Sequence, residues 1–389
     1  MKVLLIAPQP FFEVRGTPLA ILQLVKALSK LGYKVDIVTY HLGKNIKIKN
    51  VSIHRIINFP FIKNIPIGPS YTKLFLDFFI FLKAFQMCIK NHYDVVHAVE
   101  EAVFSGIVIK KIFHSPIIYD MDSSISQQLI NSGFIKNKYF LKLVCSLENW
   151  AIDNSNSVLT VCSSLTEIVY NKFPQKKVFQ LEDIPPGDGQ IEVSKEKISE
   201  LKRKLNLTEK MIILYTGNFE SYQGIDLLIK SIPEVTKYKP DVKFLLVGGE
   251  KENIIIMKRL ANYLKVEDFI IFTGKEPMEK IPAYMALTDI LVSPRCKGTN
   301  TPFKIFTYLQ SGKPIVATNL PAHTQVLNEK ISVLVEPTPK GIAGGIISLL
   351  KDEELKDKIG RKGKIFVEEN YSYKKFVKKV KEVYDSLES

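Results

Sequence analysis

Cationic and hydroxyl side chains are concentrated in the stretch CKGTNTPFKIFTYLQSGKPIVAT, residues 296–318, which contains no Asp, Glu or His. Thr301 and Pro302 are suited to the first positions of a helix. The free N–H groups and the positive dipole end of such a helix bind anions. Lys304 and Thr307 share one helix face, so both could point toward the same anion. The stretch therefore predicts an anion site; a capped structural helix with a solvated lysine is the alternative.

Two pairs of carboxylates follow predicted strands in the first half of the chain. Glu100 and Glu101 follow DVVHAV, and Asp120 and Asp122 follow PIIY. One of the glutamates could accept a proton from a hydroxyl group. The two aspartates are not expected to face the same way if the strand ends at Tyr119 and a loop follows. Capping of the next helix is the alternative role for Asp122.

A glycine approach to a helix also occurs near the N-terminus, in VRGTP. Gly16 would let an anion come close to the helix end, and Arg15 beside it could contact a phosphate. His97 lies inside a predicted strand and is interpreted as a core histidine. The remaining histidines and the four cysteines lack the spacing of a metal site, so we expect neither a metal nor another cofactor.

Short apolar runs alternate with helical patterns and must position these residues. In the first half we predict helices near 71–90, 102–113 and 138–152 between strands. The predicted strands are KVLLIA, KVDIVTY, VSIHRII, DVVHAV, SPIIYDMD and SVLTVC. Strands separated by helices predict a parallel sheet covered on both faces. Residues 1–185 are therefore assigned to a first Rossmann-like domain.

A change of composition separates the two halves. Residues 181–197, LEDIPPGDGQIEVSKEK, combine prolines, glycines and charges as an exposed linker does. The alternation then restarts, and residues 196–371 are assigned to a second Rossmann-like domain. We expect an α/β protein of two doubly wound domains that face each other across a cleft. Ligands of such sheets bind at the carboxyl ends of the strands.

Length and charge agree with this organisation. A chain of 389 residues fits two domains of roughly 150 to 200 residues. Its formal net charge of +14 is spread without a basic tail, which argues against nucleic acid and suits an anionic substrate or membrane face. The opening MKVLLIAPQPFF has too short an apolar run for a secretory signal. We expect a cytoplasmic protein.

The predicted helix 71–90 is rich in aromatic residues and carries Lys73, Lys83 and Lys90. It is too short, and too interrupted by Asp77, to span a bilayer. It could lie in the interface at the inner face of a membrane as a peripheral contact, and the alternative is an ordinary buried helix.

The motifs resemble those of family 4 glycosyltransferases with the GT-B fold, which transfer a sugar from a nucleotide diphosphate donor with retention at the anomeric carbon. The likeness covers nearly the whole chain. It rests on DVVHAVEEA, PIIYDMDSS, YTGNFESYQGIDLLIKSI, FIIFTGKEP and TPFKIFTYLQSGKPIVAT. The last motif is the most specific, because the family's donor helix ends in the same Gly-Lys-Pro. The resemblance implies metal-independent chemistry, with the nucleotide sugar as substrate and a glycan or lipid-linked acceptor.

The resemblance further implies that the second domain binds the donor and the first the acceptor. The last helix, about 372–389, would pack back on the first domain. The family usually has a His near position 122, close to the reacting sugar, where this chain has Asp122. This side chain could orient hydroxyls of the sugar or the acceptor. The predicted catalytic residues are Asp122, Glu100 and Glu101.

Four charged positions of the family's donor site differ. Thr299 and Thr307 stand where the family often has glutamates, and Asn218 and Gln223 where it has an Arg and a Lys. We expect the donor to be bound instead by the helix N-terminus, cations, hydroxyls and amides. The predicted donor-binding residues are Gly16, Gly217, Asn218, Gln223, Gly274, Arg295, Lys297, Thr299, Asn300, Thr301, Lys304 and Thr307.

Two other functions remain open on the sequence. A GT-B nucleotide-sugar epimerase would break the same bond without an acceptor. A catalytically silent GT-B binding protein would explain the changed donor residues.

Overall fold

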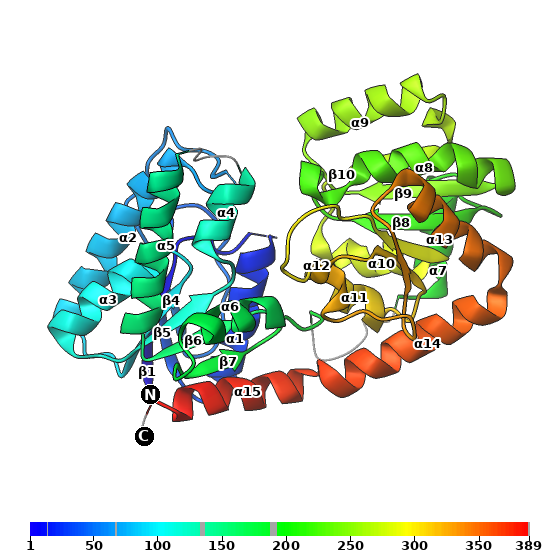
Figure 1. Cartoon of the computed structure of the whole chain (residues 1–389). Coiled ribbons are helices and arrows are strands. Elements are labelled where there is room, and N and C mark those ends of the chain that lie inside the picture. Colours follow the sequence, from blue (N-terminus) through cyan, green and yellow to red (C-terminus); the bar gives the residue numbers. More distant parts are fainter. Residues whose placement is uncertain (14, 67, 133–136, 187–192, 388–389) are drawn as a thin grey trace. The chain divides into compact units, whose positions relative to one another are not determined.

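The structure is a computed structural model that describes residues 1–13, 15–66, 68–132, 137–186 and 193–387 (Figure 1). The chain divides into unit 1, Met1–Asp183 with Lys374–Ser389, and unit 2, Ile184–Tyr373. Each unit contains one parallel sheet, so the prediction of two Rossmann-like α/β domains is confirmed. Residues 187–192 of the predicted linker lie outside the described residues.

Unit 1 is built on a seven-stranded sheet of order β3-β2-β1-β4-β5-β6-β7. Its strands are β1 (Lys2–Ala7), β2 (Lys34–Thr39), β3 (Val51–Arg55), β4 (Val95–Val99), β5 (Ile117–Met121), β6 (Ser157–Thr160) and β7 (Val178–Gln180). Its helices are α1 (Gly16–Lys30), α2 (Tyr71–Lys90), α3 (Ala102–Phe113), α4 (Ile125–Ser132), α5 (Lys138–Asn154), α6 (Ser163–Lys172) and α15 (Tyr373–Asp385). The predicted helices 71–90 and 102–113 coincide with α2 and α3.

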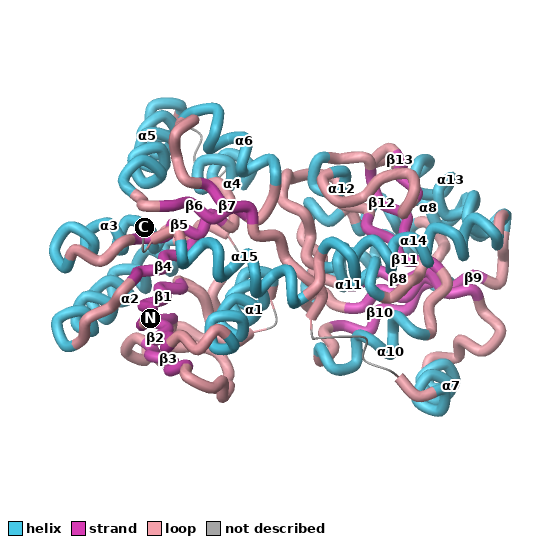
Figure 2. Tube along the Cα trace, turned by 90° about the horizontal axis from the view of Figure 1, so that it is seen from below, coloured by secondary structure: helices cyan, strands magenta, loops and turns pink. Residues whose placement is uncertain are grey.

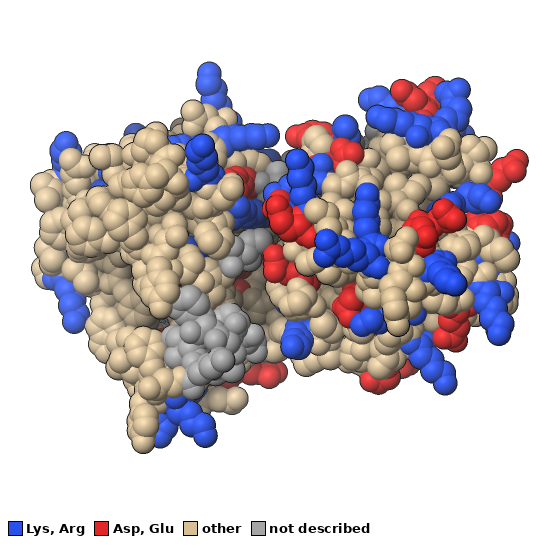
Figure 3. All heavy atoms as spheres, turned by 90° about the horizontal axis from the view of Figure 1, so that it is seen from above, with Lys and Arg blue, Asp and Glu red and all other residues tan. Residues whose placement is uncertain are grey.

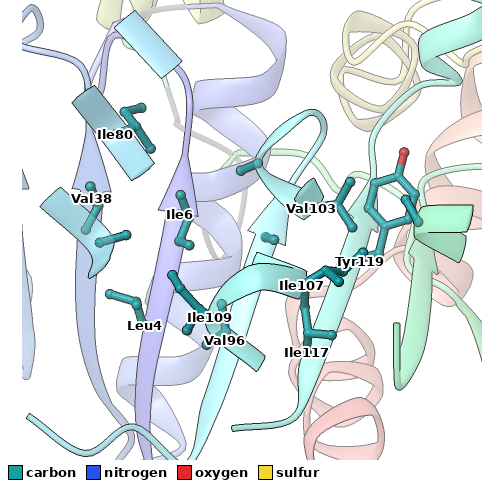
Figure 4. Packing of buried hydrophobic residues seen from close by; sticks show 14 of the residues in the cluster. Leu4, Ile6, Val38, Ile80, Val96, Val103, Ile107, Ile109, Ile117 and Tyr119 are labelled. Carbon is teal, nitrogen blue, oxygen red and sulfur yellow. The ribbon is translucent and has the colours of Figure 1, made fainter. Parts of the chain in front are cut away.

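Apolar residues on both faces of β1 explain its central place in this sheet. Leu4 and Ile6 point to one face, where they meet Val38 of β2 and Ile80 of α2 (Figure 4). Helix α3 covers the neighbouring strands β4 and β5 with Val103, Ile107 and Ile109. Because parallel strands are buried on both faces, they appear in the sequence as continuous apolar runs.

Unit 2 is built on a six-stranded sheet of order β10-β9-β8-β11-β12-β13 (Figure 2). Its strands are β8 (Met211–Thr216), β9 (Val242–Val247), β10 (Ile270–Gly274), β11 (Ile290–Ser293), β12 (Ile315–Thr318) and β13 (Val333–Val335). Its helices are α7 (Lys195–Lys204), α8 (Ile225–Tyr238), α9 (Lys251–Tyr263), α10 (Ile281–Ala286), α11 (Lys304–Gln310), α12 (Pro321–Thr324), α13 (Pro339–Lys351) and α14 (Glu353–Asn370), with 3-10 turns η1 (Ser221–Gln223), η2 (Glu267–Phe269) and η3 (Met278–Lys280).

Both strand orders contain a point at which the chain reverses its direction of progress through the sheet. In unit 1 this point lies between β1 and β4, and in unit 2 between β8 and β11. The loops that leave adjacent strands there run in opposite directions and leave a crevice at the carboxyl edge of the sheet. The candidate residues are therefore sought at these two edges.

Candidate functional site

Two cations of unit 2 lie at the reversal point between β8 and β11. We call Arg295, Lys304 and Gln223 the cationic cluster. The Nζ of Lys304 lies 3.8 Å from the centre of the Tyr215 ring and donates to Oε1 of Gln223 at 3.2 Å. Among the described residues, neither cation forms an ion pair with a carboxylate. The cluster therefore has positive charge available for an anion.

The surroundings of Lys304 disfavour its charged form. Burial, reinforced by the nearby Arg295, lowers the pKa of Lys304 well below its usual range. The guanidinium of Arg295 lies 5.1 Å from the ring centre of Tyr222, and its Nε donates to the carbonyl of Lys297 at 2.7 Å. Burial also lowers the pKa of Arg295. An anion bound between the two cations would relieve their repulsion.

Two glycines leave space beside these cations. Gly217 follows β8 with a φ of 140°, and a Cβ there would come within 2.9 Å of the Lys304 Nζ. Gly298 has a φ of 100°, and its Cβ would lie 2.5 Å from an Nη of Arg295. Other side chains would be strained at both positions and would crowd the cations. Gly274, at the end of β10, also has a positive φ of 72°.

The prediction that Thr301 and Pro302 begin a helix was wrong. Helix α11 begins at Lys304, and Phe303 occupies the cap without a side-chain hydrogen bond. Thr301 is 7 % exposed, and its Oγ1 has no hydrogen-bond partner among the described residues. Pro302 instead begins a turn, in which its carbonyl accepts a hydrogen bond from the N–H of Ile305 at 2.9 Å. Thr301 is thus a buried hydroxyl without a partner and does not cap the helix.

The remaining predicted donor residues lie in the same loops or on α11. Asn218 follows Gly217, and its Oδ1 accepts from the N–H of Glu220 at 3.3 Å. Thr299 donates to Asn300 Oδ1 at 3.4 Å. Thr307 is half-buried on α11, and Lys297 is exposed.

A buried histidine under the cationic cluster was not predicted. His323 is fully buried; its Nδ1 donates to the carbonyl of Thr318 at 2.8 Å, and its Nε2 accepts from Ser293 at 2.9 Å. Burial lowers the pKa of His323 to about 4, so the ring is neutral at physiological pH. Thr318 also donates to the carbonyl of Arg295 at 2.5 Å. This network holds the backbone at the start of the Arg295 loop.

In unit 1, a hydrogen bond joins the loops that leave β1 and β4. Gln9 donates to Oε2 of Glu100 at 2.8 Å, and Ser123 donates to Oε1 at 3.1 Å. Burial, reinforced by Glu101, raises the pKa of Glu100 to about 8. Glu101 itself forms an ion pair with Lys73 at 3.0 Å. The two adjacent glutamates therefore have different environments.

The structure corrects the expectation for the aspartates. Strand β5 continues to Met121, and both Asp120 and Asp122 line one pocket with Thr17 and Asp183. We call these four residues the acidic pocket. Thr17 donates to Oδ2 of Asp122 at 2.6 Å, and burial, reinforced by Asp120, raises the pKa of Asp122 to about 6. Burial and both neighbouring aspartates raise the pKa of Asp183 above its usual range.

The first N–H groups of helix α4 donate to Ser124 and Glu148. The N–H of Gln127 donates to Ser124 Oγ at 3.3 Å, and Glu148 of α5 accepts from the N–H of Ile125 at 2.6 Å. Gly16, as predicted, opens α1, but Arg15 forms an ion pair with Glu13 at 2.9 Å.

His97 is a core histidine, as interpreted from the sequence. Its Nε2 is 3.0 Å from Oδ2 of Asp120, and its Nδ1 is 2.8 Å from the hydroxyl of Tyr384 on α15. Both rings are fully buried. Asp120 of the acidic pocket is therefore connected to the last helix.

Comparison with known proteins shows which proteins this chain resembles. Residues 197–366 match the family model described as glycosyl transferases group 1. An uncharacterised glycosyltransferase of Methanocaldococcus jannaschii is 25% identical over 360 residues, which cover 88% of this chain and 86% of the relative. Residues 197–366, which lie in unit 2, therefore resemble the group 1 glycosyltransferases.

Further comparisons identify the fold and a second relative of this chain. The crystal structure of HepE from Anabaena, in complex with UDP and glucose, aligns with a TM-score of 0.78 at 15% identity and covers 99% of this chain and 100% of that one. The fold is GT-B. A GDP-mannose-dependent phosphatidylinositol monomannoside mannosyltransferase of Mycolicibacterium smegmatis is 25% identical over 204 residues, 50% of this chain and 53% of the relative.

Proposed function

We propose that this glycosyltransferase binds a nucleotide diphosphate sugar on unit 2 and transfers a hexose, with retention, to a glycan or lipid-linked acceptor bound by unit 1. The cationic cluster is the observation that carries the proposal. Lys304 and Arg295 have no carboxylate partner among the described residues, although burial makes both charges costly. Such cations are retained where a ligand supplies the negative charge.

A pyrophosphate fits the chemistry of this cluster. Its oxygens would accept from the ammonium of Lys304 and the guanidinium of Arg295, as charge-assisted hydrogen bonds. Thr301, whose hydroxyl is buried without a partner among the described residues, would supply a neutral donor. The same groups would stabilise the charge that develops on the leaving nucleotide diphosphate, which is why we propose that no metal is needed.

The acidic pocket and Glu100 suit an acceptor with several hydroxyl groups. Carboxylates accept hydroxyl hydrogen bonds, and Asp122 with a pKa of about 6 is mostly ionised at neutral pH. Glu100, with a pKa of about 8, holds a proton near the working pH and could exchange it with a hydroxyl. Glu101 is placed by its ion pair with Lys73 to reinforce that raised pKa.

The choice of nucleobase and acceptor is proposed from the relatives. The Anabaena structure contains UDP, and the name of the mycobacterial relative gives GDP-mannose and phosphatidylinositol monomannoside. We propose a uridine or guanosine diphosphate sugar and, for the acceptor, a glycan or lipid-linked glycan. Retention is proposed from the resemblance to family 4 enzymes.

Calorimetry with UDP and GDP, followed by transfer assays, tests this function. We expect one nucleotide to bind the wild-type chain and Arg295→Gln to weaken it by roughly 1 to 3 kcal/mol. Transfer should continue in EDTA, and NMR of the product should show the anomeric configuration of the donor. Nucleotide binding without transfer to any glycan or lipid extract would indicate a catalytically silent protein.

The acidic pocket favours an epimerase as the second candidate. Three aspartates lie in this pocket, and His97 contacts one of them, as acid–base chemistry on the sugar itself would require. Turnover of a nucleotide sugar without any acceptor would identify that activity.

A further inference from the structure

Exposed apolar side chains are concentrated on the outer side of three helices of unit 1. Of the twenty-one large hydrophobic residues exposed among the described residues, thirteen lie on α2, α3 and α5. Helix α3 packs against both α2 and α5, so the three form one layer. We call their solvent-facing side the three-helix face. This concentration is unusual, since exposed hydrophobic residues on soluble proteins are normally scattered.

The exposed residues follow helical spacing, so each helix presents a continuous stripe. On α2, Leu74, Phe78 and Leu82 are 65 %, 57 % and 45 % exposed, and on α5, Tyr139, Leu143 and Leu147 are 85 %, 52 % and 43 % exposed. The opposite side of α2 is buried in the core of unit 1. Helix α2 is therefore apolar on both sides, as expected of a helix that contacts the protein core on one side and a second apolar environment on the other.

Lysines accompany these stripes. Lys90, Lys111, Lys138 and Lys142 are exposed on the three helices, whereas Asp153 is the exposed carboxylate among their described residues. In Figure 3 the side of unit 1 that faces the viewer, at the left, is mostly tan, with blue atoms and few red ones. A second copy of this chain would bring like charges together across a two-fold interface. An anionic surface complements them instead.

We propose that the three-helix face binds the surface of an anionic lipid bilayer. Apolar side chains would enter the boundary between headgroups and acyl chains, while the lysines contact the lipid phosphates. None of the described helices is long and apolar enough to cross a membrane, so the contact is peripheral. The earlier prediction from residues 71–90 concerned α2 alone, and the structure adds α3 and α5.

The single tryptophan of the chain reports on this contact directly. Trp150 is the one Trp in the sequence; it lies on α5, is 39 % exposed, and has the Nζ of Lys111 5.4 Å from its ring centre. On binding vesicles of phosphatidylcholine mixed with phosphatidylglycerol, its fluorescence should shift to the blue and be quenched by brominated lipid. Vesicles of phosphatidylcholine alone should bind much more weakly, and added salt should reduce binding to the mixed vesicles.

Variants separate the contribution of the lysine charges from that of the apolar side chains. The measurement is sedimentation of the full-length protein with vesicles. Lys138→Gln with Lys142→Gln should lower the affinity for anionic vesicles by roughly fivefold for each lysine. Phe78→Gln with Leu143→Gln should lower it further, because polar side chains replace the inserted ones. The matched control is Ile255→Gln, Ile256→Gln on α9 of unit 2, which are 51 % and 55 % exposed; it should bind vesicles as the wild type does.

Several outcomes would overturn the proposal. The first is that the wild type does not sediment with anionic vesicles. The second is that Trp150 fluorescence does not change on binding, and the third is that the α9 control loses as much vesicle affinity as the variants of the three-helix face. A wild-type dimer that becomes monomeric in the Phe78→Gln, Leu143→Gln variant would assign the face to a second copy. Nucleotide affinity of the same variants, measured without vesicles, tests the proposed function separately, since the cationic cluster lies in unit 2.

Discussion

The hydroxyl of Tyr384 lies 2.8 Å from Nδ1 of His97, which is 287 positions earlier in the sequence. The other ring nitrogen of His97 lies 3.0 Å from Asp120. A residue of the last helix thereby fixes the orientation of a histidine that contacts the acidic pocket.

Tyr384→Phe removes this hydrogen bond and leaves the ring in place. Because His97 and Tyr384 are fully buried, the free energy of unfolding should fall by about 1 to 3 kcal/mol, the cost of an unsatisfied buried group. Urea unfolding measures the change. Tyr263→Phe, at a residue 83 % exposed, is the matched control and should have no effect. An unchanged unfolding free energy in Tyr384→Phe would mean that water replaces the bond.

Lys304→Met should weaken nucleotide binding without destabilising the free protein. The contact with phosphate is worth roughly 1 to 3 kcal/mol, and Met retains most of the side-chain packing. The pKa of Lys304 is lower in the folded protein than in the unfolded chain. The free energy of unfolding of the wild type therefore falls as the pH decreases from above the ordinary lysine pKa toward the lowered value, and the variant should lack this fall.

Calorimetry gives the affinity of the Lys304→Met variant, and thermal unfolding gives its stability. Lys230→Met, which removes a surface ion pair with Asp226, is the control and should change either quantity by less than about 1 kcal/mol. Weaker folding together with unchanged affinity would show that Lys304 is structural.

Thr307→Glu should reduce nucleotide affinity, because a carboxylate on the same helix face as Lys304 would pair with the ammonium and repel phosphate. Thr307→Gln has the same shape without the charge and should bind more tightly than Thr307→Glu. Adding Asn218→Arg to Thr307→Glu should recover part of the loss. Stronger nucleotide binding by Thr307→Glu would contradict this argument. It would indicate that replacement of the family's glutamate by Thr307 has weakened the donor site.

Restoring the family's lysine at position 223 should fail. Gln223 is 6 % exposed, and its Oε1 accepts from Lys304. Gln223→Lys would place a second cation against the first and remove the acceptor. We expect a lower melting temperature and no gain in affinity, whereas the neutral Gln223→Asn should be milder. Full stability of Gln223→Lys would show that the cluster accommodates another positive charge.

Glu100→Gln tests the raised pKa of about 8. A carboxyl whose folded pKa is raised contributes stability that is present below the unfolded value, about 4.3, and is lost as the pH rises through about 8. The wild type should therefore lose stability relative to Glu100→Gln over this interval, by at least about 1.4 kcal/mol, the value of one pKa unit. Unfolding at several pH values measures it. Parallel stability profiles for the two proteins would contradict the raised pKa.

Local patterns were sufficient to predict strands β1 to β6 and several helices, whereas β7 was not predicted. Helix α2 matches its prediction because Ser70 caps it, accepting from the N–H of Lys73, and because its apolar positions are periodic. The predicted start of α11 was wrong. Thr301 is a residue type that often caps helices, but its hydroxyl is buried and makes no hydrogen bond to any described residue of the helix. Local preference carries no information about what surrounds a residue in the fold.

The parts of the site that escaped prediction depend on contacts between distant segments. Glu148 caps α4 from another helix, so the roles of Asp122 and its serine neighbours could not be separated from sequence alone. Asp183 belongs to the acidic pocket, although the sequence around it resembles a linker. His323 gave no signal either, because its partners come from β11 and the end of β12.

The division of unit 1 into two segments has a consequence for synthesis of the chain. Phe376, Val380 and Tyr384 of α15 are buried in the unit that begins at Met1, yet the ribosome must first make all of Ile184–Tyr373. At about 5 to 20 residues per second, this delay is on the order of ten seconds or more. Unit 2 can thus fold before α15 has been made, and during this interval unit 1 exposes the apolar side chains that α15 later covers.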